Sequence, residues 1–274
     1  MGVIIEVTLK LLPLPKYRLT ALAVFERLDD ATKTVTTIMD SGILPASIEL
    51  MDQITVRCVE DLLHIGLPTD AEALLLFAFD GNYEQVVHSE LETVAVLCTS
   101  CGAQSVQTAR TTQESDRLWQ ARRSISPALA RHKPNILGED ISVPRSSVPE
   151  IIRQVRAIAA RYDLLIPVFG HAGDGNLHPN ILCNRRDPNE MQRVRAAAAE
   201  IFAAAIACGG TLSGEHGIGL LKKEFMEQDL GHDTIEAMKK SSLPLIPTIS
   251  SIQGKYFQRV EASGKEYACY YPSL

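Results

Sequence analysis

The chain has 274 residues, 46% of them hydrophobic, so it is long enough to bury a full core in one large domain or two small ones. Its 27 basic and 33 acidic residues give a net charge of −6, and no basic run carries interleaved aromatic residues, which argues against nucleic acid as a partner. The longest alanine-rich stretch, residues 195–208, is interrupted by Glu200 and is shorter than the roughly 20 apolar residues of a transmembrane helix.

Hydrophobic periodicity and turn residues predict the following elements in chain order. Strands are expected at 17–26, 49–58, 73–79, 104–110, 138–144, 164–171 and 176–183, and helices at 29–41, 83–101, 118–130, 148–162 and 188–208. The last two strands flank an Asp-Gly turn, which is typical of a hairpin. Strands that alternate with helices and include a hairpin indicate an α+β fold, with helices packed on one face of a sheet.

The two ends of the chain differ from its middle. Residues 1–15 alternate like the last strand of a preceding domain, with Pro13 and Pro15 as a linker. From Ser241 onward the periodicity disappears, so residues 241–274 match no element.

Six cysteines are scattered along the chain, which is typical of proteins from the reducing cytoplasm. Cys98 and Cys101 are spaced as a C-x-x-C pair at the end of a predicted helix. No second pair lies near them in the sequence, so we expect a structural role for both.

Two glycine-rich segments carry the main candidates for catalytic and metal-binding residues. His171 and His178 flank a Gly-Asp-Gly-Asn turn, and Glu215 and His216 lie in the segment Ser-Gly-Glu-His-Gly, before a helix expected near Ile218. The hairpin places both imidazoles at one end of the sheet, where Glu215 could complete a set of three ligands. Three such ligands with an open position are typical of a catalytic metal site. His216 could then lie behind a ligand or face the substrate as a general base.

The residues alone leave simpler interpretations open. The Asp-Gly-Asn sequence is compatible with an ordinary turn, and each histidine with a solvated strand end. Arg122 and Ser126 stand four apart on one predicted helix and could bind a carboxylate, since guanidinium binds carboxylates through two hydrogen bonds. The alternative is a solvated helix with Arg122 as surface charge. Asn180, two residues after His178, shares its strand face and could hydrogen-bond a substrate.

The two segments, His-Ala-Gly-Asp-Gly-Asn-Leu-His at 171–178 and Ser-Gly-Glu-His-Gly-Ile-Gly at 213–219, resemble the signature of a known family. This family is the C-terminal domain of FAD-linked oxidases of the vanillyl-alcohol oxidase superfamily. The resemblance is closest to members of the glycolate oxidase and D-lactate dehydrogenase type, and it extends from Met1 to about Lys240. It implies a ferredoxin-like antiparallel sheet that forms a substrate-binding cap domain.

The resemblance also implies roles for single residues. His171, His178 and Glu215 would hold zinc or another divalent transition metal, and His216 would be the catalytic base that takes the proton of the substrate hydroxyl. The 2-hydroxy acid would be held by Arg122, Ser126 and Asn180. Position 126 is Ser where some members have Thr, and a lysine that some members carry before Asp140 is missing, so the choice of hydroxy acid stays open.

The same resemblance predicts the domain organisation. Residues 1–15 would be the terminal strand and linker of a missing FAD-binding domain, and residues 16–240 the substrate-binding cap domain with its metal site. Family members finish with a segment like Asp-Pro-Asn-Asn-Ile-Leu-Asn-Pro-Gly-Lys-Ile-Phe, and DNA that encodes residues 245–257 can encode this segment in another frame. We therefore expect a frameshift after Lys240 and a poorly ordered, out-of-frame tail at 241–274.

The sequence thus predicts FAD-dependent oxidation of a small D-2-hydroxy acid, of the glycolate or D-lactate type, to the 2-oxo acid. The FAD would be bound mainly by another domain, so the chain alone would be inactive. Expected partners are the hydroxy acid and a separate FAD-domain chain or iron–sulfur subunit, with no nucleic acid and no transmembrane segment. The expected location is the cytoplasm, with the periphery of the inner membrane as a second option. Alternatives are a non-catalytic module that binds metal and hydroxy acid, or a stand-alone metallohydrolase.

Overall fold

The computed structural model describes residues 6–11 and 13–245, with side-chain surroundings described up to Lys240. The described chain divides into two compact units, residues 10–218 and a smaller unit of residues 6–9 and 219–245. None of the helices in these ranges is both long and apolar enough to cross a membrane. The expectations for residues 1–5 and 246–274 lie outside the described residues.

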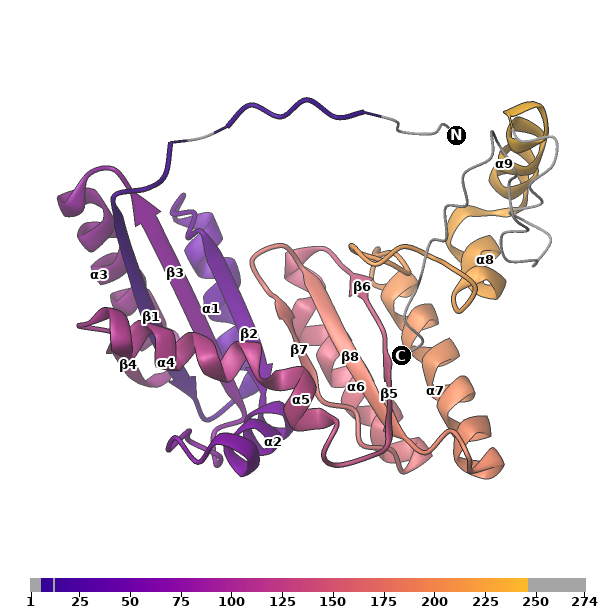
Figure 1. Ribbon diagram of the computed structural model, residues 1–274, viewed down its shortest axis with the longest axis horizontal. Coiled ribbons are helices and arrows are strands. Elements are labelled where there is room, and N and C mark those ends of the chain that lie inside the picture. The colour runs from indigo at the N-terminus through magenta and orange to yellow at the C-terminus, as the bar shows by residue number, and fades with distance from the viewer. Residues whose placement is uncertain (1–5, 12, 246–274) are drawn as a thin grey trace, which may run out of the picture. The chain divides into compact units, whose positions relative to one another are not determined.

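The first half of the larger unit has the ferredoxin-like arrangement that the family resemblance implied. Its elements are β1 (Tyr17–Phe25), α1 (Leu28–Asp40), β2 (Ser47–Asp52), α2 (Gln53–Leu63), β3 (Ala73–Gly81), α3 (Glu84–Ser100) and β4 (Ala103–Thr108). The strands lie in the order β4-β1-β3-β2, and each neighbouring pair is antiparallel (Figure 1). The crossover helices α1 and α3 pack against β1 and β3.

The second half continues the same sheet. Its elements are α4 (Thr112–Arg123), α5 (Ile125–Leu129), β5 (Asn135–Gly138), β6 (Ile141–Ser142), η1 (Arg145–Ser147), α6 (Val148–Tyr162), β7 (Val168–His171), β8 (Asn176–Cys183) and α7 (Pro188–Ala207). β7 pairs with β2, β8 with β7, and β5 and β6 with successive parts of β8. Residues 139 and 140 therefore lie at a break between two short strands on one edge of β8.

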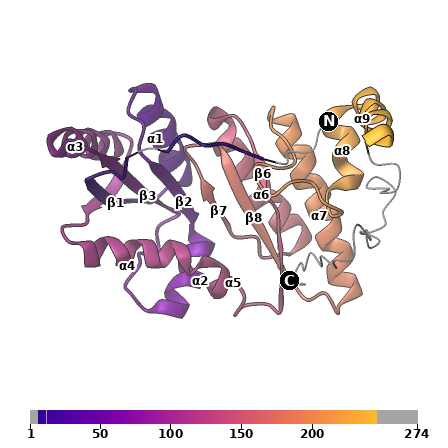
Figure 2. The same ribbon diagram turned by 45° about the horizontal axis from the view of Figure 1, so that its top comes forward.

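Apolar side chains cover both faces of the sheet, because successive residues of a strand point to opposite sides. Leu22, Met51 and Leu74 belong to a buried cluster that includes residues of α2, α4 and α5. The helices α1, α3 and α6 lie on the other side, as two views of the ribbon show (Figure 2). The antiparallel sheet with packed helices confirms the predicted α+β class. Helices cover both faces, however, where the sequence led us to expect one.

Two predicted elements differ from the structure for local reasons. The strand expected at 49–58 ends at Asp52, whose carboxylate accepts a hydrogen bond from the Thr55 backbone and caps α2. The apolar residues after Asp52 follow a helical period that short-range alternation did not reveal. The helix expected at 118–130 is two helices, broken at Ser124. Pro127 explains the break, because it lacks the N–H and crowds the carbonyl one turn earlier.

The smaller unit contains the 3-10 turn η2 (Lys223–Phe225) and the helices α8 (Met226–Leu230) and α9 (His232–Leu245). The helix expected near Ile218 does not begin there, since the first helical turn starts at Lys223. Helix α9 continues to Leu245, although the segment from Ser241 was expected to match no element. Its first turn carries Asp233, which favours a helix N-terminus.

Candidate metal and active site

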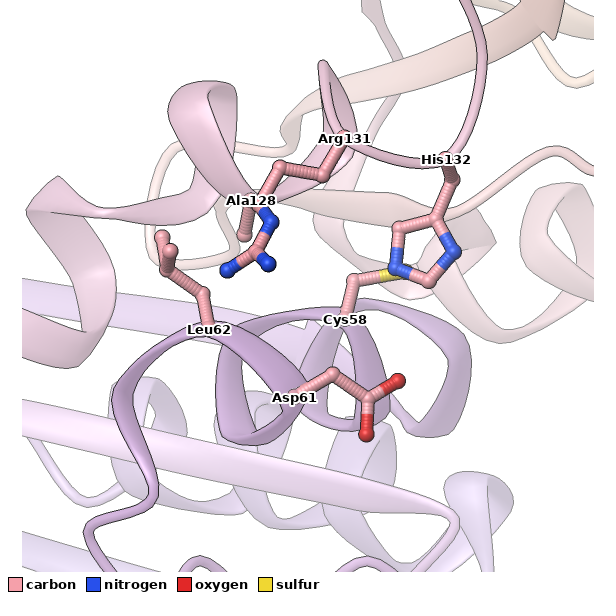
Figure 3. A pocket seen from close by; sticks show the side chains of 6 residues that line it. All are labelled: Cys58, Asp61, Leu62, Ala128, Arg131 and His132. Atoms are coloured by element: carbon pink, nitrogen blue, oxygen red, sulfur yellow. The ribbon is translucent and has the colours of Figure 1, made fainter.

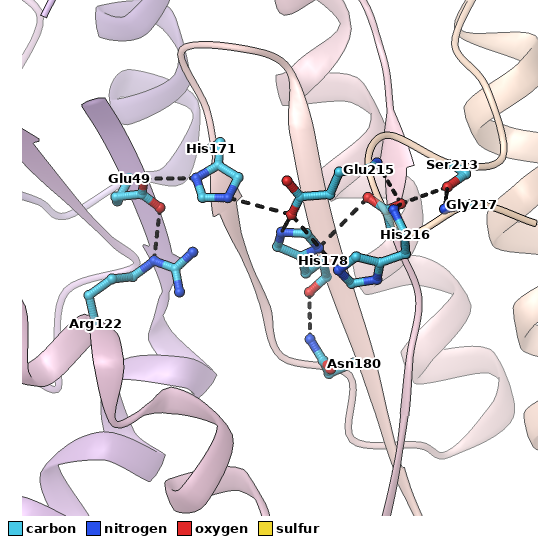
Figure 4. Close-up of polar contacts among 10 residues, drawn as sticks. Glu49, Arg122, His171, His178, Asn180, Ser213, Glu215, His216 and Gly217 are labelled. Carbon is cyan, nitrogen blue, oxygen red and sulfur yellow. Dashed lines mark hydrogen bonds and ion pairs between the residues drawn. The ribbon is translucent and has the colours of Figure 1, made fainter. Parts of the chain in front are cut away.

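The candidate site lies on the sheet face that α4 covers, where β2, β7 and β8 meet. Glu49 of β2 pairs directly with His171 of β7, and Phe169 pairs with His178 of β8. Residues that face each other across an antiparallel pair share one side of the sheet. The register therefore directs the Glu49 carboxylate and both imidazoles to the same region (Figure 4).

Three candidate ligands converge in the structure. The Glu215 Oε1 atom lies 3.4 Å from His178 Nε2 and 3.7 Å from His171 Nε2. The three donor atoms lie within 4.8 Å of one another, and the two imidazole rings meet edge to face. Two imidazoles and a carboxylate are the donor types that zinc and similar ions bind.

Electrostatics also suit a metal at this point. Burial lowers the pKa of His178 to about 4, although the nearby Asp140 carboxylate acts in the opposite direction. The His178 ring is therefore neutral at physiological pH, and a neutral imidazole nitrogen can donate a lone pair to a cation. The residues present thus fit a divalent transition metal.

The loop that carries Glu215 is held by Asp140. The Asp140 Oδ2 atom accepts hydrogen bonds from Ser213 Oγ at 2.8 Å and from the backbone N–H groups of Glu215 and His216 at 2.9 and 2.8 Å. Asp140 Oδ1 lies 3.9 Å from His178 Nδ1. Asp140, His178 and His216 form a second possible ligand group. Asp140 is buried and already engaged by the loop, whereas Glu215 is half exposed, so Glu215 is the carboxylate better placed to reach an ion.

His216 lies beside this cluster rather than within it. Its ring stacks on His178 with 5.2 Å between centroids, and its Nε2 atom is 3.8 Å from Glu215 Oε1. Its side chain is 55% exposed. The position thus leaves the imidazole accessible to a small molecule near the three candidate ligands.

Arg122 is fixed at the site from two sides, unlike a surface charge. Its Nε atom donates to Glu49 Oε2 at 2.8 Å, and its guanidinium carbon lies 4.9 Å from the centre of the Phe169 ring. Burial by itself raises the pKa of Glu49, but the hydrogen bond from Ser47, the charge of Arg122 and the bond from His171 hold it below its ordinary value. Glu49 is thus an ionised acceptor that joins Arg122 to His171.

The positions of the two other expected substrate contacts, Ser126 and Asn180, point to the site less clearly than that of Arg122. Ser126 is exposed and lies in α5, beyond the break that separates it from Arg122 in α4. Asn180 shares the strand face of His178 and is buried, and its amide nitrogen donates to the His178 carbonyl at 2.9 Å. That bond leaves the second amide hydrogen of Asn180 for another acceptor.

Sequence reasoning missed Glu49 and the anchoring role of Asp140. A signal existed for both, since each is an acid within a predicted strand, and charged side chains are rarely buried unless they are paired. What the sequence could not supply was the partner, because Glu49 and His171 are 122 positions apart.

A hollow outside the candidate site lies between α2 and α5, with a volume of about 220 Å³ (Figure 3). It is lined by Cys58, Asp61, Leu62, Ala128, Arg131 and His132. Burial raises the pKa of the Cys58 thiol to about 11, so the thiol stays protonated at neutral pH and is a poor nucleophile. The adjacent histidine therefore does not make this hollow a thiol-based catalytic site.

Comparisons with known proteins point to one family. The profile of FAD linked oxidases, C-terminal domain, matches residues 14–241. The chain is 43% identical over 259 residues to the glycolate oxidase subunit GlcD of Bacillus subtilis (strain 168), covering 94% of this chain and 55% of that protein. It is 30% identical over 238 residues to a D-lactate dehydrogenase of Anaerostipes hadrus, covering 84% of this chain and 50% of the relative.

The fold is shared with a crystal structure of p-cresol methylhydroxylase with substrate bound. The TM-score is 0.65 at 13% identity, covering 86% of this chain and 52% of that one. The chain therefore spans about half the length of each of these relatives.

Proposed function

The chain belongs to the family of FAD-linked oxidase C-terminal domains, and from this premise we propose that it supplies the substrate- and metal-binding half of an FAD-dependent dehydrogenase of small D-2-hydroxy acids. The relatives named as a glycolate oxidase subunit and a D-lactate dehydrogenase support this class of substrate. The single observation that carries the proposal is the convergence of His171, His178 and Glu215 beside Arg122 on one sheet face.

In the proposed site, His171, His178 and Glu215 hold zinc or another divalent transition metal. When bound, such an ion polarises the 2-hydroxyl of the substrate and lowers its pKa. His216, next to the ligands and accessible, accepts the hydroxyl proton at its Nε2 atom.

The substrate carboxylate pairs with Arg122. Its Nε atom is occupied by Glu49, which leaves the two terminal nitrogens, for which the described residues show no hydrogen bond, to bind the ligand. A guanidinium edge of this kind binds a carboxylate through two parallel hydrogen bonds. Asn180 and Ser126 are the further proposed contacts, Asn180 through its remaining amide hydrogen and Ser126 through its exposed hydroxyl.

FAD supplies the hydride acceptor when it is bound, as the family name indicates. In this proposal the flavin is bound mainly by another domain. We therefore expect the isolated chain to bind the hydroxy acid without oxidising it. A FAD-domain chain would supply the flavin that accepts the hydride, and an iron–sulfur subunit would then take the electrons from the reduced flavin.

Calorimetric titration tests the proposal. The metal-free chain is titrated with zinc and then with glycolate or D-lactate, and we expect heat of binding for the hydroxy acid only after zinc is present. His178→Ala should abolish both signals, whereas the control His132→Ala, at an exposed histidine outside the site, should retain them. Hydroxy acid binding that is equal with and without zinc would refute the proposal. Reduction of a dye by the chain without added flavin would refute the expected inactivity.

A further inference from the structure

We propose that Glu49 is a positioning residue that couples the metal ligand His171 to the substrate-binding Arg122 and thereby selects acids whose hydroxyl is next to the carboxylate. This inference rests on the proposed function. Glu49 lies on β2, far in the sequence from both glycine-rich segments, and its side chain is only 5% exposed. Its Oε1 atom lies 2.8 Å from His171 Nδ1, and its Oε2 atom 2.8 Å from Arg122 Nε (Figure 4).

The first bond fixes the orientation and tautomer of His171. An ionised carboxylate has no hydrogen to donate, so the His171 Nδ1 atom must carry the proton and donate it to Glu49. The lone pair of a neutral ring then lies on Nε2, the atom that faces Glu215. A carboxylate behind a histidine ligand holds the ring in its binding orientation and strengthens it as a donor.

The second bond fixes the plane of the Arg122 guanidinium. Glu49 binds one edge through Nε, and the Phe169 ring lies against the face of the group. Phe169 also contacts His178, with 5.5 Å between ring centroids. Glu49 and Phe169 together thus hold Arg122, the proposed carboxylate-binding group, and the two proposed metal-binding histidines.

This arrangement has a consequence for substrate choice. Because one buried carboxylate holds both groups, the spacing between them cannot adjust independently to a longer ligand. A 2-hydroxy acid presents its hydroxyl and carboxylate on adjacent carbons, whereas a 3-hydroxy acid inserts a methylene between them. Glu49 is therefore expected to favour glycolate over 3-hydroxypropionate.

A glutamine at this position cannot replace the carboxylate. The three side-chain partners of Glu49 all donate hydrogen bonds, Ser47 and His171 to Oε1 and Arg122 to Oε2, whereas an amide offers one oxygen acceptor and one NH₂ donor. In Glu49→Gln, either His171 or Arg122 faces the NH₂ group and loses its partner. Glu49→Asp keeps the charge but is one methylene shorter, so it reaches at most one of the two groups.

The test measures binding and so does not require turnover. Zinc affinity is measured by competition with a chromophoric chelator, and affinities for glycolate and 3-hydroxypropionate are measured by calorimetry at saturating zinc. We expect Glu49→Gln to lose about 10- to 100-fold in zinc affinity, with weaker glycolate binding and a reduced preference for glycolate. The control is Glu190→Gln, which alters another buried acid that pairs with Lys133 outside the site.

The possible failures can be told apart. If the wild-type chain binds no zinc, or His171→Ala binds it equally well, the proposed function itself is wrong. If wild type binds zinc and His171→Ala does not, but Glu49→Gln keeps both the zinc affinity and the glycolate preference, the inference about Glu49 alone is wrong. Should Glu49→Gln fail to fold by circular dichroism, Glu49→Asp replaces it, and wild-type values in that variant would overturn the inference.

Discussion

Asp52→Asn should make the protein more stable at neutral pH, and the gain should disappear in acid. The Asp52 carboxyl is buried, and its Oδ2 atom forms no hydrogen bond with the described residues. Burial raises its pKa from 3.8 to about 6, against the opposing hydrogen bonds from Thr55. The folded state therefore favours the protonated acid, and ionisation costs stability.

The magnitude follows from the difference between the two pKa values. The protonated Asp52 carboxyl makes its full contribution to the free energy of unfolding below pH 3.8, and this contribution is lost as the pH rises through about 6. A shift of about two units corresponds to about 3 kcal/mol in all, of which about 2 kcal/mol is lost between about pH 4.5 and about pH 7.5. Asparagine cannot ionise and can still cap α2, so the variant should lack this loss.

Urea unfolding at several pH values between these limits measures the difference in free energy of unfolding between variant and wild type. Asp40→Asn, which removes an exposed carboxylate at the end of α1, controls for the change in net charge. If the difference between Asp52→Asn and wild type is the same at both ends of the pH range, the buried carboxyl does not ionise as argued.

Three further predictions concern the site and its surroundings. Asp140→Asn should weaken zinc binding about 10- to 100-fold, because all three loop hydrogen bonds go to Oδ2, and the neutral amide oxygen that replaces this atom is a weaker acceptor than a carboxylate oxygen; unchanged affinity in chelator competition would show that the loop needs no charged anchor. Gly175→Ala should lower stability by about 1–3 kcal/mol in chemical unfolding, since a Cβ there would lie 2.1 Å from the Val143 carbonyl oxygen at a φ of +73°. In Gly173→Ala the nearest atom is 3.5 Å away, so this variant should behave as wild type, and equal losses in both would contradict the argument. Cys58 should stay unmodified by an aromatic disulfide reagent at neutral pH until urea unfolds the chain, and rapid labelling of the native protein would contradict its burial.

Much of the fold could be predicted because its elements carry strong local patterns. The helix expected at 148–162 has those bounds in the structure, since its valines and isoleucines recur at the helical period and are all buried. The strand β5 could not be predicted, because it has only four residues, none of them buried. It exists because β8 offers it an edge, and such a tertiary contact leaves no periodic signal.

The candidate site, too, could be predicted only in part. The two histidines could be brought together from sequence because a hairpin joins them, whereas Glu215 lies on a separate glycine-rich segment and its place in the set was implied by the family resemblance. The geometry of Arg122 could not be predicted, since the neighbouring arginine and the polar helix around it suggested a solvated surface. Its partner comes from β2, and only the register between β2 and β7 brings that strand to the site.

The register between β2 and β7 has a consequence for how the larger unit unfolds. β2 and β7 share three paired positions, and one of these is the pair of Glu49 with His171. This short ladder is the strand pairing that joins the two halves of the sheet. Arg122 packs over the first half and the histidines belong to the second, so a ligand held by both would bridge the two halves. Its binding would oppose their separation by about 2.7 kcal/mol when the ligand is present at a hundredfold excess over its dissociation constant. Ligand should therefore slow amide hydrogen exchange most along β2 and β7, and the two halves should then unfold as one cooperative body.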